Sequence, residues 1–307
     1  MTDVFSCIPT CPMPAVFAQS TLVTLPDQRR LEILRYGDPA HPAVLFHHGY
    51  ASSGLSIPPN AELLSQLQLQ ILAPNRPGVG HSDVHAAMSL ESFAADVFFA
   101  LDALRVAGPV TLLGWSAGGL YAQAQTALFP GRVAALHLLN TCLPLGEPET
   151  YQALPRRWKT IKFLNDYASW LARPLARRLS QQWTREPDRM IDRFMQLLGP
   201  AEQQEAHNPV SRIVLRDAAR HGFTHRGQGV YYDGRALCRR PGFPLAAIQA
   251  PTTIWHGTDD FIWHPAPIRY LASRLPHATL RMLPGEGHML FLKYWRQILE
   301  QVRAELK

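Results

Sequence analysis

Residues 114–118, Gly-Trp-Ser-Ala-Gly, carry the clearest chemical signal in this sequence of 307 residues. An apolar run at 110–113 precedes them, and a segment of helical character follows at 120–124. A Gly-x-Ser-x-Gly at a strand-to-helix turn is a nucleophile elbow, which forces the serine into a strained conformation and exposes its hydroxyl. The free N–H groups at the start of the helix stabilise negative charge on a substrate oxygen. The pattern predicts that Ser116 is a nucleophile.

A serine nucleophile needs a neutral imidazole to take its proton and a carboxylate to orient that imidazole. Residues 252–256 have the composition of a buried strand and are followed by Asp259 and Asp260. Residues 278–283 have the composition of the next strand and are followed by a loop that contains His288. Serine, acid and histidine therefore occur in the chain order that this elbow requires.

Two upstream segments complete the pattern. Residues 43–50 form an apolar run that ends in His-Gly-Tyr, and residues 75–82 read Asn-Arg-Pro-Gly-Val-Gly-His-Ser. With the elbow and the two later loops, these segments resemble the α/β-hydrolase superfamily, in its cap-bearing serine hydrolase branch. The resemblance covers nearly all of the chain. It implies an α/β-hydrolase fold, a mostly parallel sheet flanked by helices, with an inserted helical cap.

The resemblance also implies roles for individual residues. Backbone N–H groups of Tyr50 and Ala117 would form the oxyanion hole. In relatives the acid lies three residues after the glycine that ends its strand, which selects Asp260 and leaves Asp259 as a turn residue. The superfamily's usual aspartate at the start of the Arg-Pro-Gly loop is Asn75 here. Serine at 116 argues against alkyl-enzyme chemistry, which requires a carboxylate nucleophile.

The order of the expected elements supports this fold. Residues 21–25 and 31–36 predict a hairpin. Strands at 44–48, 70–73, 110–113 and 133–139 then alternate with helices at 61–67 and 92–104, which is typical of a sheet covered on both faces. Strand-like runs nearly vanish between 143 and 241. We therefore expect an arm at 1–18, a core at 19–142 and 242–307, and a cap at 143–241.

A cap in this position covers the nucleophile and supplies much of the pocket. Large apolar side chains are the pocket candidates, and packing between cap and core is the alternative for each of them. They are Trp115, Trp158, Trp170, Trp183, Phe194 and Met195.

The sequence does not predict a metal or a cofactor. Thirteen histidines are present, but none falls in a His-Glu-x-x-His pattern, and the four cysteines lack the repeated short spacing of a structural zinc site. Residues 78–80 read Gly-Val-Gly, but Asp83 stands where a dinucleotide fingerprint has its third glycine. His47 and His48 follow a buried strand, and we expect them to hold the backbone of the oxyanion turn.

The basic charge of the chain is concentrated in the expected cap. The formal net charge is +6, and residues 144–240 contain 17 Lys and Arg against 10 Asp and Glu. An anionic substrate, an acidic partner or a membrane surface would be attracted to such a surplus. A solvated helix face, with arginine stems covering apolar surface, is the interpretation we favour. No nucleic-acid recognition motif accompanies the charge.

Other features indicate a cytoplasmic enzyme. The sequence has no run of about 18 apolar residues, so stable insertion into a membrane is not predicted. Residues 1–18 lack the pattern of a signal peptide. Four cysteines are few for a chain of this size and are expected to be free thiols, although Cys7 and Cys11 could form a disulfide in an oxidising setting. The sequence carries no signal for an oligomeric state.

The predicted reaction is acyl transfer from a small-molecule substrate to water, with a carboxylic ester as the bond cleaved. An amide, a thioester, a lactone and the carbon–carbon bond of a diketone-like substrate are the alternatives within the fold. Aminopeptidase-like members need an acidic cluster in the cap, and this cap is basic. From another class, a non-catalytic ligand receptor on the same fold can retain the triad, so turnover is the discriminating property. A pure interaction role is disfavoured by the intact triad.

Overall fold

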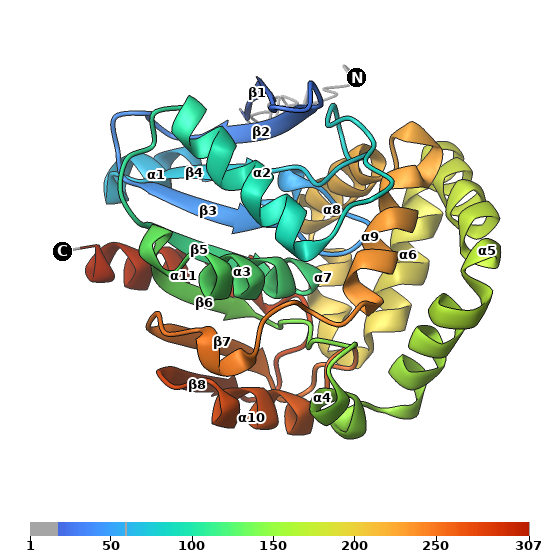
Figure 1. The fold of residues 1–307 in the computed structure, drawn as a ribbon. Helices are drawn as coiled ribbons and strands as arrows, with labels where there is room; N and C mark the ends of the chain where they lie inside the picture. Colours follow the sequence, from blue (N-terminus) through green and yellow to red (C-terminus); the bar gives the residue numbers. More distant parts are fainter. Residues whose placement is uncertain (1–17, 59, 307) are drawn as a thin grey trace, which may run out of the picture.

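The computed structural model describes residues 18–58 and 60–306 and builds them around an eight-stranded sheet (Figure 1). Nearly all of the arm predicted at 1–18 lies outside the described residues. The strands in chain order are β1 (Gln19–Thr24), β2 (Arg30–Tyr36), β3 (Ala43–His47), β4 (Gln70–Pro74), β5 (Val110–Trp115), β6 (Val133–Leu139), β7 (Thr252–Gly257) and β8 (Ala278–Leu283).

The sheet is parallel apart from one edge. Its strand order is β1-β2-β4-β3-β5-β6-β7-β8. β1 pairs antiparallel with β2, and β2 pairs antiparallel with β4, while every later pair is parallel. All side chains of β4, β5 and β7 are buried, as expected for strands that are covered on both faces. The predicted hairpin and the predicted α/β-hydrolase sheet are confirmed.

Helices cover both faces of the sheet (Figure 1). On one face lie α2 (Leu90–Ala103), α3 (Ala117–Leu128) and α10 (Pro265–Arg274), and on the other lie α1 (Ala61–Leu67) and α11 (Leu290–Glu305). The core accordingly divides into two apolar clusters. In the first, Phe93 and Tyr121 meet edge to face at 5.3 Å, and in the second Phe46 and Trp295 do so at 5.8 Å. Burying each such ring stabilises the fold by about 1.5–3 kcal/mol.

Between β6 and β7 the chain leaves the sheet and forms what we call the helical insertion. It contains α4 (Pro148–Ala153), α5 (Arg156–Arg185), α6 (Pro187–Leu198), α7 (Gln203–His207), α8 (Pro209–Gly222) and α9 (Gln228–Cys238). Figure 1 shows these helices beside the carboxyl ends of the central strands. The insertion coincides with the part of the sequence in which strand-like runs vanish. Its longest helix, α5, is interrupted by non-helical backbone at Ala168 and contains Pro174.

The insertion is packed tightly onto the core. At Gly222, the last residue of α8, a Cβ atom would lie 2.6 Å from the carbonyl oxygen of Ser52. Only glycine permits this approach. Trp183 of α5 stacks on Phe223 and lies in the second apolar cluster. The approach of α8 to residue 52 therefore fixes one end of the insertion next to the loop that follows β3.

The described cysteines, Cys142 and Cys238, are buried free thiols. Burial raises the pKa of Cys238 to about 11 and that of Cys142 well above its usual value. Neither side chain forms a thiolate at neutral pH, so neither is a candidate nucleophile. Cys7 and Cys11 lie outside the described residues. No helix in residues 18–58 and 60–306 has the length and apolar character needed to cross a membrane.

Candidate active site

Ser116 lies on the sharp turn between β5 and α3. Its φ of 52° is in the left-handed region, which is uncommon and strained for a residue with a side chain. A Cβ on Gly114 would lie 2.6 Å from the Cα of Gly119, and one on Gly118 would overlap the carbonyl oxygen of His47. The two motif glycines therefore permit close backbone contact on both sides of the turn. The Ser116 N–H also donates to the carbonyl of Leu139 at 3.0 Å, which ties the turn to the end of β6.

The structure brings Ser116, His288 and Asp260 together in one chain of hydrogen bonds. His288 Nε2 lies 3.0 Å from Ser116 Oγ, and His288 Nδ1 lies 3.0 Å from Asp260 Oδ2. The side chains of His288 and Asp260 are almost fully buried. Asp259 instead lies in an exposed turn, where its carboxylate accepts a hydrogen bond from Thr258. The residue selected by the superfamily register is thus the one in contact with His288.

The surroundings of Asp260 favour its ionised form. Its Oδ1 accepts the backbone N–H groups of Ile262 and Trp263 at 2.7 and 3.0 Å, and its Oδ2 accepts the amide of Asn140 at 2.8 Å. Burial by itself raises the pKa of Asp260, but the neighbouring His288 and these donors outweigh burial and hold the pKa below its usual range. A carboxylate held in this way fixes the imidazole of His288 with its proton on Nδ1 and leaves Nε2 free to accept one.

Two residues next to the Ser116–His288–Asp260 hydrogen bonds were not predicted from the sequence. Asn140 follows β6 with a φ of 44° and donates its side-chain amide to Gly287 O as well as to Asp260. Glu202 belongs to the insertion, and its Oε1 accepts the backbone N–H of Met289 at 2.9 Å. Burial raises the pKa of Glu202. Asn140 had a usable signal, a polar residue at the carboxyl end of a strand, whereas Glu202 comes from a segment with no motif.

The proposed oxyanion donors lie on two adjacent backbone segments. Tyr50 follows β3, and Ala117 begins α3, where Gly118 packs against the carbonyl of His47. Within the described part of the chain, the N–H groups of Tyr50 and Ala117 donate no hydrogen bond to another protein group. Two free donors beside the serine are what an oxyanion hole requires.

A buried arginine fixes the loop that carries Tyr50. Arg76 donates to the carbonyls of His48 and Gly49 at 2.8 and 2.7 Å, and it forms an ion pair of 2.9 Å with Asp233 of α9. Asp233 also accepts the hydroxyl of Tyr121 at 2.7 Å. The network couples the oxyanion loop to the insertion through a fully buried charge pair. Loss of either partner would leave an uncompensated charge.

The histidines expected to hold this turn have separate partners. His48 Nδ1 lies 2.9 Å from the carbonyl of Gly49, within the turn itself. His47 Nε2 lies 2.7 Å from the side chain of Gln125 on α3. Burial lowers the pKa of His47 to about 3, so this ring is neutral at physiological pH.

The large apolar side chains named as pocket candidates lie in different environments. Trp115 is buried, contacts the ring of His288 at 5.8 Å and donates to the carbonyl of His288. Trp158 stacks on Trp263 at 4.2 Å, close to the Asp260 loop. Trp170 is 70% exposed on α5. Trp183 is buried against Phe223, Phe194 is partly buried, and Met195 is buried in the second apolar cluster.

The insertion also contains a cavity lined by basic residues. Its volume is about 360 Å³, and it is lined by Arg173, Pro174, Arg177, Arg226, Gly227 and Gln228. Part of the basic surplus read from the sequence therefore gathers in one hollow. A separate cluster of Glu32, His81 and His221 offers ligand atoms of the kind that bind metals.

His256 makes folding stability depend on pH. It is fully buried, its Nε2 lies 2.8 Å from the carbonyl of Trp263, and burial lowers its pKa to about 4. Between pH 6.5 and about 4, His256 is protonated in the unfolded chain but stays neutral in the folded one. The free energy of unfolding therefore decreases as the pH falls from 6.5 toward 4. The expected loss is about 1.4 kcal/mol per pH unit. Urea unfolding of wild type and His256→Gln between pH 7.5 and 4.5 measures it. The variant is expected to show the shallower pH dependence, and equal slopes would contradict the assignment.

Comparison with known proteins agrees with this architecture. The model of the alpha/beta hydrolase fold family matches residues 42–293. The chain belongs to the α/β hydrolase family. It is 27% identical to a pimeloyl-[acyl-carrier protein] methyl ester esterase of Chromobacterium violaceum, over 87% of this chain and 94% of that protein. It is 30% identical to the polyketide synthase ThaQ of Burkholderia thailandensis, over 89% of this chain but only 12% of that protein.

Solved structures of α/β hydrolases show the same fold. An esterase from Thermogutta terrifontis matches with a TM-score of 0.67 and 21% identity, covering 94% of this chain and 98% of that one. An enol-lactonase from Burkholderia xenovorans matches with a TM-score of 0.67 and 20% identity, covering 93% and 99%. With relatives named as esterases and hydrolases, the protein is an enzyme, a hydrolase of the α/β fold.

Proposed function

We propose that this hydrolase cleaves a carboxylic ester through an acyl-enzyme formed on Ser116. The hydrogen-bonded chain from Ser116 through His288 to Asp260 carries the proposal. His288 Nε2 takes the hydroxyl proton as Ser116 Oγ attacks the carbonyl carbon, and then gives that proton to the departing alkoxide. Asp260 stabilises the imidazolium that forms in between. A water molecule, deprotonated by the same nitrogen, then releases the carboxylic acid.

The tetrahedral intermediate places negative charge on the former carbonyl oxygen. We assign its stabilisation to the backbone N–H groups of Tyr50 and Ala117. Arg76 supports this role because it holds the two carbonyls that precede Tyr50 and thereby fixes the direction of its N–H. Loss of one such donor in comparable sites costs roughly 10²–10³-fold in kcat.

We assign the helical insertion, 143–241, as a cap over the core formed by 19–142 and 242–307. Its position beside the carboxyl ends of the central strands supports this assignment. Glu202 and Asp233 of the insertion contact the His288 loop and the Arg76 network, so the cap and the reacting groups are held by the same hydrogen bonds. A cap in contact with the site excludes water and shapes the substrate pocket.

Two observations favour an acyl group presented by an acidic carrier protein. Several relatives are named as esterases acting on a methyl ester carried by acyl-carrier protein, and the C. violaceum protein matches over almost its full length. The cap of this chain is basic, and three of its arginines line one cavity. Long-range attraction between a basic cap and an acidic carrier raises the association rate and weakens with salt.

The test combines covalent labelling with turnover. Wild type is treated with a fluorophosphonate probe, the modified residue is located by mass spectrometry, and hydrolysis is measured on aryl esters of graded acyl length. We expect a single adduct on Ser116 and multiple turnovers, with the optimum length giving the size of the pocket. Faster, salt-sensitive hydrolysis of a methyl ester on carrier protein than of the free methyl ester would support the carrier assignment.

Each alternative predicts a different result. Binding of ligand without turnover would indicate a receptor on the same fold. Hydrolysis confined to amides, lactones or carbon–carbon bonds would keep the Ser116 chemistry and reject the ester assignment. An adduct on a residue other than Ser116 would contradict the proposed nucleophile.

A further inference from the structure

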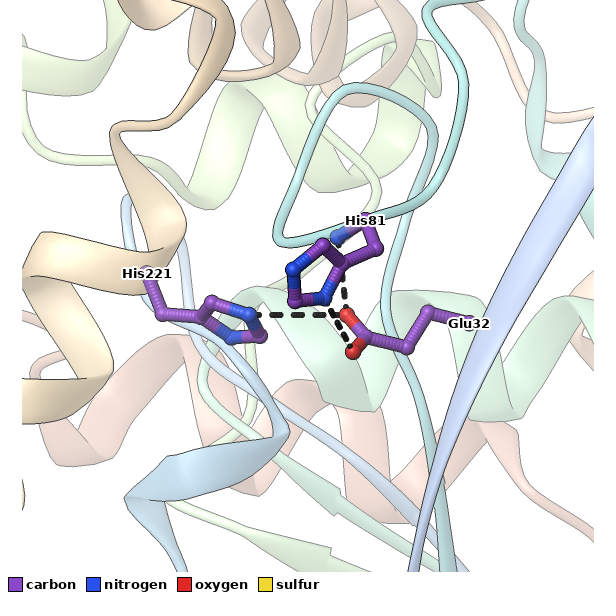
Figure 2. Close-up of side chains that lie close together, drawn as sticks. All are labelled: Glu32, His81 and His221. Carbon is purple, nitrogen blue, oxygen red and sulfur yellow. Dashed lines mark hydrogen bonds and ion pairs between the residues drawn. The ribbon is translucent and has the colours of Figure 1, made fainter. Parts of the chain in front are cut away.

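Three ligand-type side chains from distant parts of the chain meet beside β2 (Figure 2). Glu32 lies on β2, His81 lies in the loop after β4, and His221 lies near the end of α8 in the insertion. One ligand atom from each lies within 4.8 Å of the others. These ligands are separated by 49 and 189 residues in the sequence, so short-range metal motifs do not reveal them.

The spacing of the cluster suits one small cation. His81 Nδ1 lies 2.8 Å from Glu32 Oε1, and His221 Nε2 lies 3.5 Å from Glu32 Oε2. In a tetrahedral zinc site with bonds of about 2.0–2.2 Å, ligand atoms are about 3.3 Å apart. The two distances, which end at different carboxylate oxygens of Glu32, lie on either side of that value. The third pair, at no more than 4.8 Å, needs to close by about 1.5 Å at most. The side chain of His81 is 69% exposed, so close packing does not hold it in one position.

The carboxylate of Glu32 is already held in place. Its side chain is 1% exposed and accepts the hydroxyl of Ser20 at 2.6 Å, the amide of Asn75 at 2.8 Å and the backbone N–H of His81 at 2.9 Å. Neutral donors behind a ligating carboxylate orient it as outer-shell partners do in known metal sites. The Asn75 that departs from the superfamily pattern supplies one of these donors, whereas an ionised aspartate there would repel Glu32.

The cluster also lacks a permanent positive charge. Among the ion pairs of the described residues, Glu32 has no Lys or Arg partner and is paired only with the two imidazoles. A divalent cation would neutralise a buried carboxylate that has no Lys or Arg partner.

We propose that Glu32, His81 and His221 form a binding site for one divalent transition-metal ion of the zinc type. Two imidazoles and one carboxylate are ligands that Zn²⁺ prefers, and the exposed side of His81 leaves the fourth position to water. The ion replaces the contacts that the two rings make with Glu32. Because His221 belongs to the insertion and the other ligands belong to the core, the bound ion ties α8 to β2 and to the loop that carries His81.

The test uses the untagged chain, stripped with a chelator and titrated with Co²⁺, whose visible absorption reports on coordination, followed by displacement with Zn²⁺. We expect one ion per chain and a rise in the thermal midpoint. His81→Ala and His221→Ala are each expected to weaken binding by at least about tenfold. His277→Ala removes an exposed histidine outside the cluster and serves as the matched control, with wild-type binding expected.

Several outcomes would overturn the site. These are the absence of saturable binding of Co²⁺ and Zn²⁺ to the wild-type chain, binding that His81→Ala leaves unchanged, and a loss in His277→Ala equal to that in His81→Ala. Because His81 is mostly exposed, His81→Ala preserves the fold and decides the question even where His221→Ala unfolds. Circular dichroism of each variant establishes which case applies.

Discussion

Ser116→Ala is expected to lower kcat for ester hydrolysis by about 10⁴-fold or more and to leave the fold intact. The variant removes the oxygen that lies 3.0 Å from His288 Nε2, so no protein group remains to attack the substrate carbonyl. Alanine keeps the Cβ of serine, and the left-handed conformation at residue 116 is therefore no more strained than before. Steady-state hydrolysis of an aryl ester and the thermal midpoint by circular dichroism measure the two effects separately.

The same pairing predicts that losses at Ser116 and His288 do not add. His288→Ala removes the general base that accepts the proton of Ser116. Ser116→Ala removes the nucleophile that His288 would activate. The double variant is therefore expected to be about as inactive as either single one. Ser65→Ala, on the exposed surface of α1, is the matched control and should retain wild-type activity. If Ser116→Ala kept more than about a tenth of the activity, Ser116 would not be the nucleophile.

The core of this fold could be predicted from local patterns. Buried parallel strands are short apolar runs, and β3, β5, β6 and β7 each stand out in the sequence as such a run. The carboxyl ends of these parallel strands meet at one edge of the sheet. Polar residues that follow the strands therefore converge there. Ser116 directly follows β5, Asp260 lies three residues after β7, and His288 lies five residues after β8. Their contact in the structure is therefore the result that the strand pattern implies.

Contacts between distant segments could not be predicted in this way. Arg76 and Asp233 form a buried pair across 157 residues, and Glu202 reaches the His288 loop across 87. Each partner lies in a segment whose own pattern specifies only a loop or a helix. The orientation of the insertion on the core decides these contacts, and that orientation depends on the fit of whole surfaces, such as Gly222 against Ser52.

The same limit applies to the aromatic residues of the insertion. The sequence does not distinguish the surroundings of Trp158 from those of Trp170. In the structure, Trp158 stacks on Trp263, whereas Trp170 is largely exposed to solvent. The non-helical backbone at Ala168 lies between the two residues and interrupts the regular helix. A single helical periodicity over residues 158–179 therefore cannot predict the burial of both tryptophans correctly.

The neighbouring aspartates provide the sharpest test of the acid in the proposed triad. Asp260→Asn is expected to lower kcat by about 10⁴-fold near neutral pH. An asparagine side chain can present its N–H₂ group to His288 Nδ1, which would then accept a hydrogen bond and move the ring proton to Nε2, the atom that must receive the serine proton. The neutral amide also offers no charge to stabilise the imidazolium.

Asp259→Asn makes the identical chemical change one residue earlier, in an exposed turn where only Thr258 donates to the side chain. Its kcat is expected to remain within about twofold of wild type, since surface changes away from such networks are nearly neutral. Comparing the pair on one ester substrate, with thermal midpoints recorded for both, separates catalysis from stability. A large loss in Asp259→Asn with activity retained in Asp260→Asn would transfer the role of the acid to Asp259. Equal losses in both variants would show that the hydrogen bond between Asp260 and His288 does not explain the activity, because Asp259 makes no contact with that ring.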